Sequence, residues 1–310
     1  MVAGLNNNKS QEGLNPTRFH RNLIILLIGS IIVTNSFIVF SSNDERVFFI
    51  DITINITAAI ALGLALITVY RQKTDGLYGK TYASLALGLA LWFIAELVWA
   101  YFELALNIIA PFPSIADAFW LAGYGFFAYY IYRIYNFIAS KQTIRPVVVI
   151  IVSVATAIIF GYIVGMTINI AESSDGQNKH QNHMILLLVS IAYPILDAVL
   201  IVPAILILWS VRAGQLASAH WTLLALALLF TAVADSGFGY FAVLNIDTAQ
   251  EVKWKWDILY NMNKVKEVEW IWDILYNATY LSIAAALCWH NYFFIFDERK
   301  VMKKWQKENR

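Results

Sequence analysis

The feature that most constrains this chain is a series of eight apolar runs, each long enough to cross a bilayer, which takes about 20 residues. The runs lie near 23–42, 48–70, 81–103, 115–137, 147–169, 184–210, 218–243 and 271–295. None alternates apolar and polar residues as membrane β-strands do. They are also apolar on every side, unlike the helices of a soluble domain. The sequence therefore predicts an all-α, multi-pass protein of the cell membrane with eight transmembrane helices and the lipid bilayer as its surroundings.

Composition agrees with this class and excludes several others. Hydrophobic residues make up 59% of the chain and charged residues 14%, against about 25% charged in soluble domains. The net charge of +1 predicts no nucleic-acid partner, and a single cysteine excludes an internal disulfide framework. There is no Gly-rich phosphate loop, HExxH or G-x-S-x-G. We therefore expect no enzyme, no catalytic residue, no cofactor and no metal site, and His290 is expected to serve in packing.

Basic residues predict the orientation in the membrane. The tail 1–22 carries Lys9, Arg18 and Arg21, and the tail 296–310 carries six Lys or Arg residues. With eight spans, the other basic loops fall on the same side as these tails. Cytoplasmic loops are enriched in Lys and Arg, so both termini are expected in the cytoplasm.

The chain repeats itself over a long interval, which predicts two parallel halves. Ala95-Glu96 in the third run corresponds to Ala234-Asp235 in the seventh, about 139 residues later. The fourth and eighth runs share an i, i+3, i+7 pattern. It reads Asp117, Trp120, Tyr124 in one and Asp273, Tyr276, Tyr280 in the other. Four helices per unit give both units the same orientation, so we expect parallel four-helix repeats at 23–140 and 141–295.

A second, local duplication marks an insertion. Residues 251–261 recur almost unchanged as 267–277. Only the second copy continues into an apolar run, so the region near 251–266 is expected to be an insertion in the last external loop. Its tryptophans would suit the membrane interface.

Acidic residues inside the spans are the main functional signal, because a charge buried in hydrocarbon costs at least about 2.5–3.5 kcal/mol. Five qualify, namely Glu96, Asp117, Asp197, Asp235 and Asp273. Three interpretations stay open: the carboxyls are protonated, they accept hydrogen bonds from neighbouring side chains, or they hold a cation.

Aromatic residues beside these acids favour an outward-facing pocket. Trp92, Glu96 and Trp99 share one helix face, and Tyr193 lies four residues before Asp197. Carboxylates beside rings suit a small cationic ligand through charge pairing and cation–π contacts. The expected ligand-binding residues are Trp92, Glu96, Trp99, Asp117, Trp120, Tyr124, Tyr193, Asp197, Asp235, Tyr240, Asp273, Tyr276 and Tyr280. The plainer alternative is that the rings form an interfacial belt and that single acids join helices.

Three motifs carry a resemblance to a known family. They are Pro111-Phe-Pro-Ser114-Ile-Ala-Asp117-Ala-Phe-Trp-Leu-Ala-Gly-Tyr124, Tyr193-Pro-Ile-Leu-Asp197, and the segment from Asp273 to Leu281. Over residues 50–295 the chain resembles the seven- to nine-span sensory input domains found before bacterial diguanylate cyclases and histidine kinases. Independently of the family, Ser114 is expected to cap a helix with Asp117 near its positive end.

The resemblance implies a sensory role with an unidentified stimulus. The 15 residues of 296–310 are too few for a cyclase or kinase, so signalling is expected to need a separate partner or a second copy of the chain. The expected function is a membrane sensor or ligand-binding module. The alternatives are a transporter or proton- or cation-coupled carrier that uses the buried carboxylates, and an accessory subunit of a membrane complex.

Overall fold

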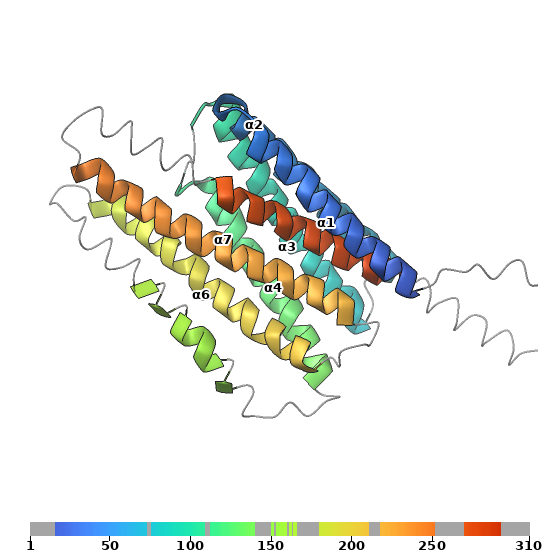
Figure 1. The fold of residues 1–310 in the computed structure, drawn as a ribbon. Coiled ribbons are helices and arrows are strands. Elements are labelled where there is room, and N and C mark those ends of the chain that lie inside the picture. Colours follow the sequence, from blue (N-terminus) through green and yellow to red (C-terminus); the bar gives the residue numbers. More distant parts are fainter. Residues whose placement is uncertain are drawn as a thin grey trace, which may run out of the picture.

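The computed structural model describes residues 16–72, 76–108, 112–139, 150–151, 153–159, 161–162, 164–165, 180–210, 218–251 and 270–292. Within these ranges the protein is all-helical and contains no strand (Figure 1). The helices are α1 (Pro16–Phe40), α2 (Asn43–Gln72), α3 (Gly76–Ala100), α4 (Ile115–Ala139), α6 (His180–Ser210) and α7 (Ser218–Glu251). A π-helical turn, η1 (Tyr101–Ala105), extends α3, and a last helix spans Trp270–Tyr292.

Six of the described helices are long and apolar enough to cross a membrane. They are Arg21–Phe40, Glu45–Gln72, Gly79–Ala105, Leu187–Trp209, Ala219–Phe238 and Trp270–Tyr292. The tyrosine-rich helix α4 has 25 residues but is not among the six. Of the predicted fifth span, 147–169, the structure describes short helical pieces between residues 150 and 165, and of the predicted insertion, 251–266, only Glu251 is described. The multi-pass prediction thus agrees with the structure, while the count of eight remains a prediction.

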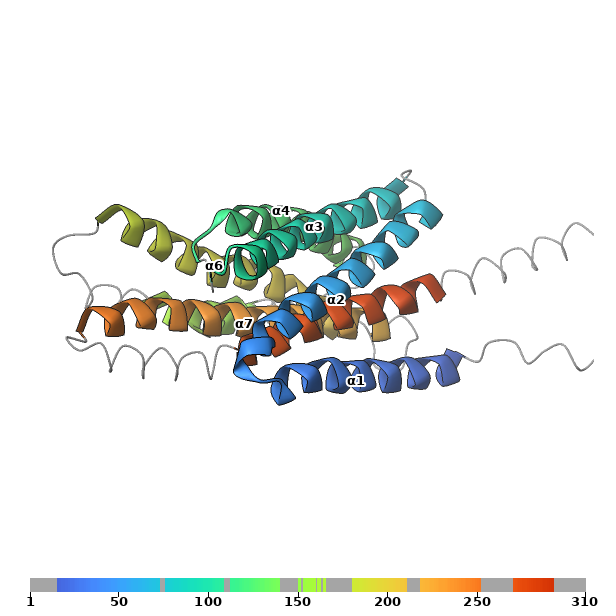
Figure 2. The same cartoon turned by 90° about the horizontal axis from the view of Figure 1, so that it is seen from above.

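The helices pack as one elongated bundle, with α3 against α2 and α4, and α6 against α4 and α7. Figure 2 shows the same bundle from above, with α1 along one edge. The buried share of each helix agrees with this arrangement. Only 22% of the apolar window of α1 is buried, against 56% for Trp270–Tyr292. Large apolar side chains such as Leu26, Ile32 and Phe37 are exposed on α1, a surface suited to lipid rather than to water.

Polar side chains join the last helix to the helices around it. Asn277 donates to Thr34 and Asn35 of α1, both at 2.7 Å, and Asn291 donates to Thr68 of α2 at 2.9 Å. Interhelical hydrogen bonds of this kind are a main source of specificity in apolar bundles. They fix both the depth and the rotation of Trp270–Tyr292, which carries three of the predicted site residues.

A second hydrogen-bond cluster lies toward the start of α3. Tyr82 Oη is 3.2 Å from His220 Nε2 and 3.0 Å from His290 Nδ1. His220 Nδ1 lies 2.8 Å from the Ala286 carbonyl, and His290 Nε2 lies 2.5 Å from Gln72 Nε2. A carbonyl only accepts, so His220 carries its hydrogen on Nδ1 and accepts from Tyr82 at Nε2. Tyr82 then accepts from His290 Nδ1, and His290 accepts from the Gln72 amide. With this assignment each polar atom named here has a hydrogen-bond partner, and the bonds join α2, α3, α7 and the last helix. His290 therefore contributes hydrogen bonds between helices as well as packing.

One close contact fixes an indole ring that faces the site. A Cβ added at Gly123 of α4 would lie 2.5 Å from Trp92 Cδ1 of α3. The absence of a side chain at Gly123 therefore lets the Trp92 indole lie directly on the α4 backbone. In that position Trp92 Nε1 donates to the Trp120 carbonyl at 3.0 Å.

Candidate functional site

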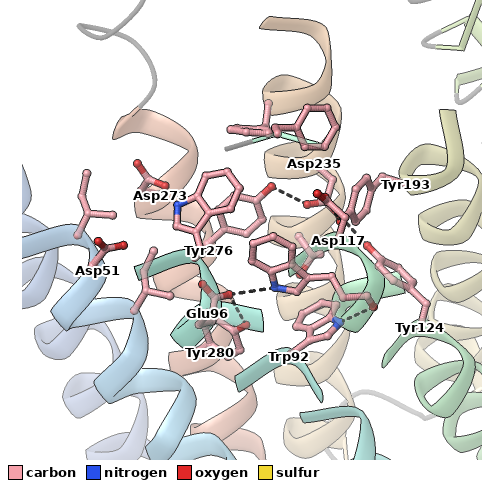
Figure 3. A pocket seen from close by; sticks show the side chains of 17 residues that line it. Asp51, Trp92, Glu96, Asp117, Tyr124, Tyr193, Asp235, Asp273, Tyr276 and Tyr280 are labelled. Carbon is pink, nitrogen blue, oxygen red and sulfur yellow. Dashed lines mark hydrogen bonds between the residues drawn. The ribbon is translucent and has the colours of Figure 1, made fainter. Parts of the chain in front are cut away.

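A cavity of about 70 Å³ lies between the described helices, near the end of α3 and the start of α4 (Figure 3). That volume has room for a few water molecules or a small organic ion. Its lining comprises Ile50, Asp51, Ile54, Trp92, Glu96, Trp99, Phe112, Asp117, Trp120, Tyr124, Tyr193, Thr231, Asp235, Phe238, Asp273, Tyr276 and Tyr280. All of the predicted ligand-binding residues are among them except Asp197 and Tyr240.

Glu96 of α3 is held by two donors on other helices. Its Oε1 accepts a hydrogen bond from Tyr280 Oη at 2.6 Å and from Trp120 Nε1 at 3.3 Å. Glu96 itself is only 9% exposed. The carboxylate is thus oriented from two sides, by α4 and by the last helix.

Asp235 of α7 is held in the same manner. Its Oδ2 accepts from Tyr124 Oη and its Oδ1 accepts from Tyr276 Oη, both at 2.6 Å. Asp235 and Glu96 are close enough to interact electrostatically. Two hydrogen-bonded carboxyls therefore share one small cavity.

The donors of these two acids occupy matching positions in the i, i+3, i+7 pattern of the sequence. Tyr280 occupies the position in the eighth run that Tyr124 occupies in the fourth, and Tyr276 corresponds to Trp120. Glu96 accepts from Tyr280 and Trp120, whereas Asp235 accepts from Tyr124 and Tyr276. Each acid thus has one donor from its own half of the sequence and one from the other half.

Asp197 of α6 lies behind the cavity wall rather than in it. Its Oδ1 is 2.6 Å from Tyr124 Oη, and the residue is 2% exposed. Its Oδ2 is buried and has no hydrogen-bond partner among the described residues. The sequence placed Asp197 in the pocket, but the structure separates it from the lining by the Tyr124 ring. Among the described residues, the Tyr124 hydroxyl links Asp197 to the cavity.

The start of α4 confirms the predicted helix cap. Ala116 N–H donates to Ser114 Oγ at 3.2 Å, and Ser114 N–H donates to Asp117 Oδ2 at 2.6 Å. Ser114 thus caps the helix through the second N–H group, and Asp117 accepts from the cap residue as the acid of a capping box does. The other Asp117 oxygen, Oδ1, accepts from Tyr193 Oη at 2.8 Å. The carboxylate thus serves the helix start while it also lines the cavity.

Aromatic rings form most of the remaining wall. Trp99 contacts Trp120 and Phe238 at centroid distances of 5.5 and 5.9 Å, and Trp92 contacts Tyr124 at 5.6 Å. Among the described residues that line the cavity, none is Lys, Arg or His. The ionisable groups of the described lining are therefore carboxyls and tyrosine hydroxyls, surrounded by electron-rich rings.

Several lining residues were not predicted from the sequence. Asp51 is buried on α2 and faces the cavity. It is a fourth aspartate of the lining, and its place in an apolar run was the available signal. Ile50, Ile54 and Phe238 carried no such signal, since apolar residues are expected throughout a span. Thr231 in the seventh run and Phe112 just before the fourth run were not predicted either. Tyr240 is a residue of α7 whose side chain lies outside those the structure describes.

Comparison with protein-family models, curated proteins and solved structures finds no match to this chain. The resemblance to sensory input domains therefore depends on the three motifs alone. What the cavity does has to be argued from its geometry.

Proposed function

We propose that this protein is a membrane-embedded sensor or ligand-binding module that takes a small organic cation in the Glu96–Asp235 cavity. The observation that carries the proposal is the composition of the lining, in which acids face aromatic rings and none of the described lining residues is Lys, Arg or His. A desolvated cation over an aromatic face gains about 2 kcal/mol or more. The carboxylates add charge pairing in surroundings with little water.

The tyrosine hydroxyls narrow the class of ligand. Both oxygens of Asp235 and Oε1 of Glu96 already accept short hydrogen bonds. A ligand with diffuse positive charge needs no further acceptor in a fixed direction. The small volume of about 70 Å³ favours a compact ligand with few heavy atoms. Together these features favour an alkylammonium, such as a methylated amine, over a large or strongly hydrated ion.

We also propose a finer architecture for the helices that surround the cavity. Eight spans in two parallel four-helix repeats would place Glu96 and Asp235 at equivalent positions about an axis along the membrane normal. The reciprocal donors of the two acids support that symmetry. With both termini cytoplasmic, the cavity would open to the outside.

Binding of choline by the purified protein in detergent tests the proposal, with 3,3-dimethyl-1-butanol as the uncharged analogue of the same shape. We expect calorimetry to show saturable choline binding and no binding of the alcohol. Glu96→Gln should weaken choline binding at least tenfold, because it removes a charge while keeping the shape of the side chain. The control is Glu45→Gln, an exposed acid outside the cavity lining. Equal binding of choline and the alcohol would refute a cation site.

A proton- or cation-coupled carrier is the second candidate. The Asp197–Tyr124–Asp235 contacts favour it, since connected buried carboxyls are typical of proton pathways. Proteoliposomes separate the two functions. A sensor binds choline without transport, whereas a carrier moves labelled choline across the bilayer and couples that movement to an imposed pH gradient.

A further inference from the structure

Tyr124 contacts two carboxyls with a single hydroxyl. Its Oη is 2.6 Å from Asp197 Oδ1 and 2.6 Å from Asp235 Oδ2. A tyrosine hydroxyl donates one hydrogen bond and accepts others. At 2.6 Å each contact requires a hydrogen between the two oxygens. Two hydrogens are needed, and Tyr124 supplies one of them, so the other must belong to a carboxyl.

The partners of the two acids assign that hydrogen. Asp235 accepts from Tyr276 at Oδ1, so a donation from Tyr124 at Oδ2 leaves both of its oxygens satisfied as a carboxylate. Asp197 has Oδ2 buried without a partner among the described residues. An ionised carboxylate in that position would be costly, whereas a neutral carboxyl is tolerated. The hydrogen therefore belongs to Asp197 Oδ1, and the bonds run in one direction, from Asp197 through Tyr124 to Asp235.

We propose that Asp197 is an inner proton site, and that a cation entering the cavity expels this proton through Tyr124. The proposal rests on the cation-binding function proposed above. In the step, the O–H bond of Asp197 breaks as its proton passes to Tyr124 Oη. The Tyr124 proton passes to Asp235 Oδ2 and from there to water in the cavity. One positive charge enters and one leaves, so the charge of the cluster is unchanged.

The groups around the hydrogen-bonded series Asp197–Tyr124–Asp235 favour such an exchange of a proton for a cation. Among the described residues, the titratable side chains that face it are Glu96 of α3, Asp117 of α4, Tyr193 of α6 and Tyr276 and Asp273 of the last helix, with Asp51 of α2 next to Glu96. Each is acidic or neutral. Close acids cannot all ionise at low cost, so the empty cavity retains a proton. A bound cation offsets the same negative charge. Binding of the cation therefore lowers the affinity for the proton, and binding of the proton lowers the affinity for the cation.

The test measures proton release when choline binds, by calorimetry in two buffers that differ in ionisation heat. For the unmodified protein we expect close to one proton released per choline at the pH where the inner site is occupied. The Kd for choline should fall by up to tenfold for each unit that the pH rises across that range. Choline binding with no proton release at any pH between 5 and 8 would overturn the proposal.

Asp197→Asn locates the proton, because an amide can still donate to Tyr124 Oη but has no proton to exchange. We expect this variant to bind choline with no proton release and with a Kd independent of pH. Glu45→Gln is the matched control and should release protons as the unmodified protein does. Release that persists in Asp197→Asn would place the proton on another carboxyl and overturn the assignment.

Infrared spectroscopy tests the inner site without any ligand. The protonated carboxyl band of the unmodified protein should lose one component in Asp197→Asn and keep it in Glu45→Gln. If choline does not bind at all, the proposed function fails, while this band still supports or refutes the proton on Asp197. The two failures are therefore distinguishable.

Discussion

Tyr280 donates its hydroxyl hydrogen to Glu96 at 2.6 Å, across a separation of 184 residues in the sequence. The bond joins the last helix to α3 in the centre of the bundle, where Tyr280 is 2% exposed. The carboxylate is therefore held by a residue from the far end of the chain. This relationship makes the cavity and the packing of the bundle depend on the same side chains.

Tyr280→Phe should destabilise the protein by about 1–2 kcal/mol, because it removes the shorter of the two bonds to a buried carboxylate. Choline binding should weaken as well, since Glu96 would be oriented only by Trp120 at 3.3 Å. Thermal unfolding in detergent measures the first effect and calorimetry the second. Tyr70→Phe is the control, as Tyr70 is 86% exposed. An unchanged melting temperature in Tyr280→Phe would mean that this bond contributes little.

Gly123→Ala should close part of the cavity. The new Cβ would lie 2.5 Å from Trp92 Cδ1, and the indole would have to move away from α4, at a cost of about 1–3 kcal/mol. Gly125→Ala, two residues further along the same helix, has nothing within 4 Å of the new Cβ and should be neutral or slightly stabilising. Unfolding and choline binding of the two variants give a matched comparison. Equal behaviour would contradict the close packing of Trp92.

Tyr82→Phe should break the histidine cluster. His220 Nε2 and His290 Nδ1 both lose their partner, and each buried polar group left unpaired costs about 1–3 kcal/mol. The cluster lies roughly 21 Å along α3 from Glu96, so choline affinity should change little in protein that folds. Unfolding combined with titration separates the two effects. A large loss of affinity with normal stability would show instead that the two ends of the bundle are coupled.

The part of the site that could be predicted from the sequence consists of residues that are unusual in a membrane span. Glu96, Asp117, Asp235 and Asp273 were identifiable because acids are rare in apolar runs, and the duplication then pointed to Trp120, Tyr124, Tyr276 and Tyr280. The structure brings these residues to one cavity. Phe238 gave no signal, because a ring in a span can equally face lipid, a core or a ligand.

The position of Asp197 could not be predicted for a geometric reason. Its four-residue spacing from Tyr193 correctly placed both side chains on one face of α6. Which of them reaches the cavity depends on how α6 crosses α4, and that is set by packing between helices far apart in sequence. In the structure Tyr193 lines the cavity, while Asp197 lies one turn deeper behind Tyr124.

The orientation in the membrane gives the last prediction. If both termini are cytoplasmic, residue 255 lies outside the cell and residue 304 inside. Cys288 is the only native cysteine, so Cys288→Ser gives a background for Lys255→Cys and Lys304→Cys. We expect a membrane-impermeant maleimide to label position 255 in intact cells, and position 304 only after permeabilisation. The physical reason is the excess of Lys and Arg in the tails and alternate loops, which resist translocation. The reverse labelling pattern would mean that both termini lie outside the cell and that the cavity faces the cytoplasm. The natural source of its cation would then be metabolites inside the cell rather than compounds in the medium.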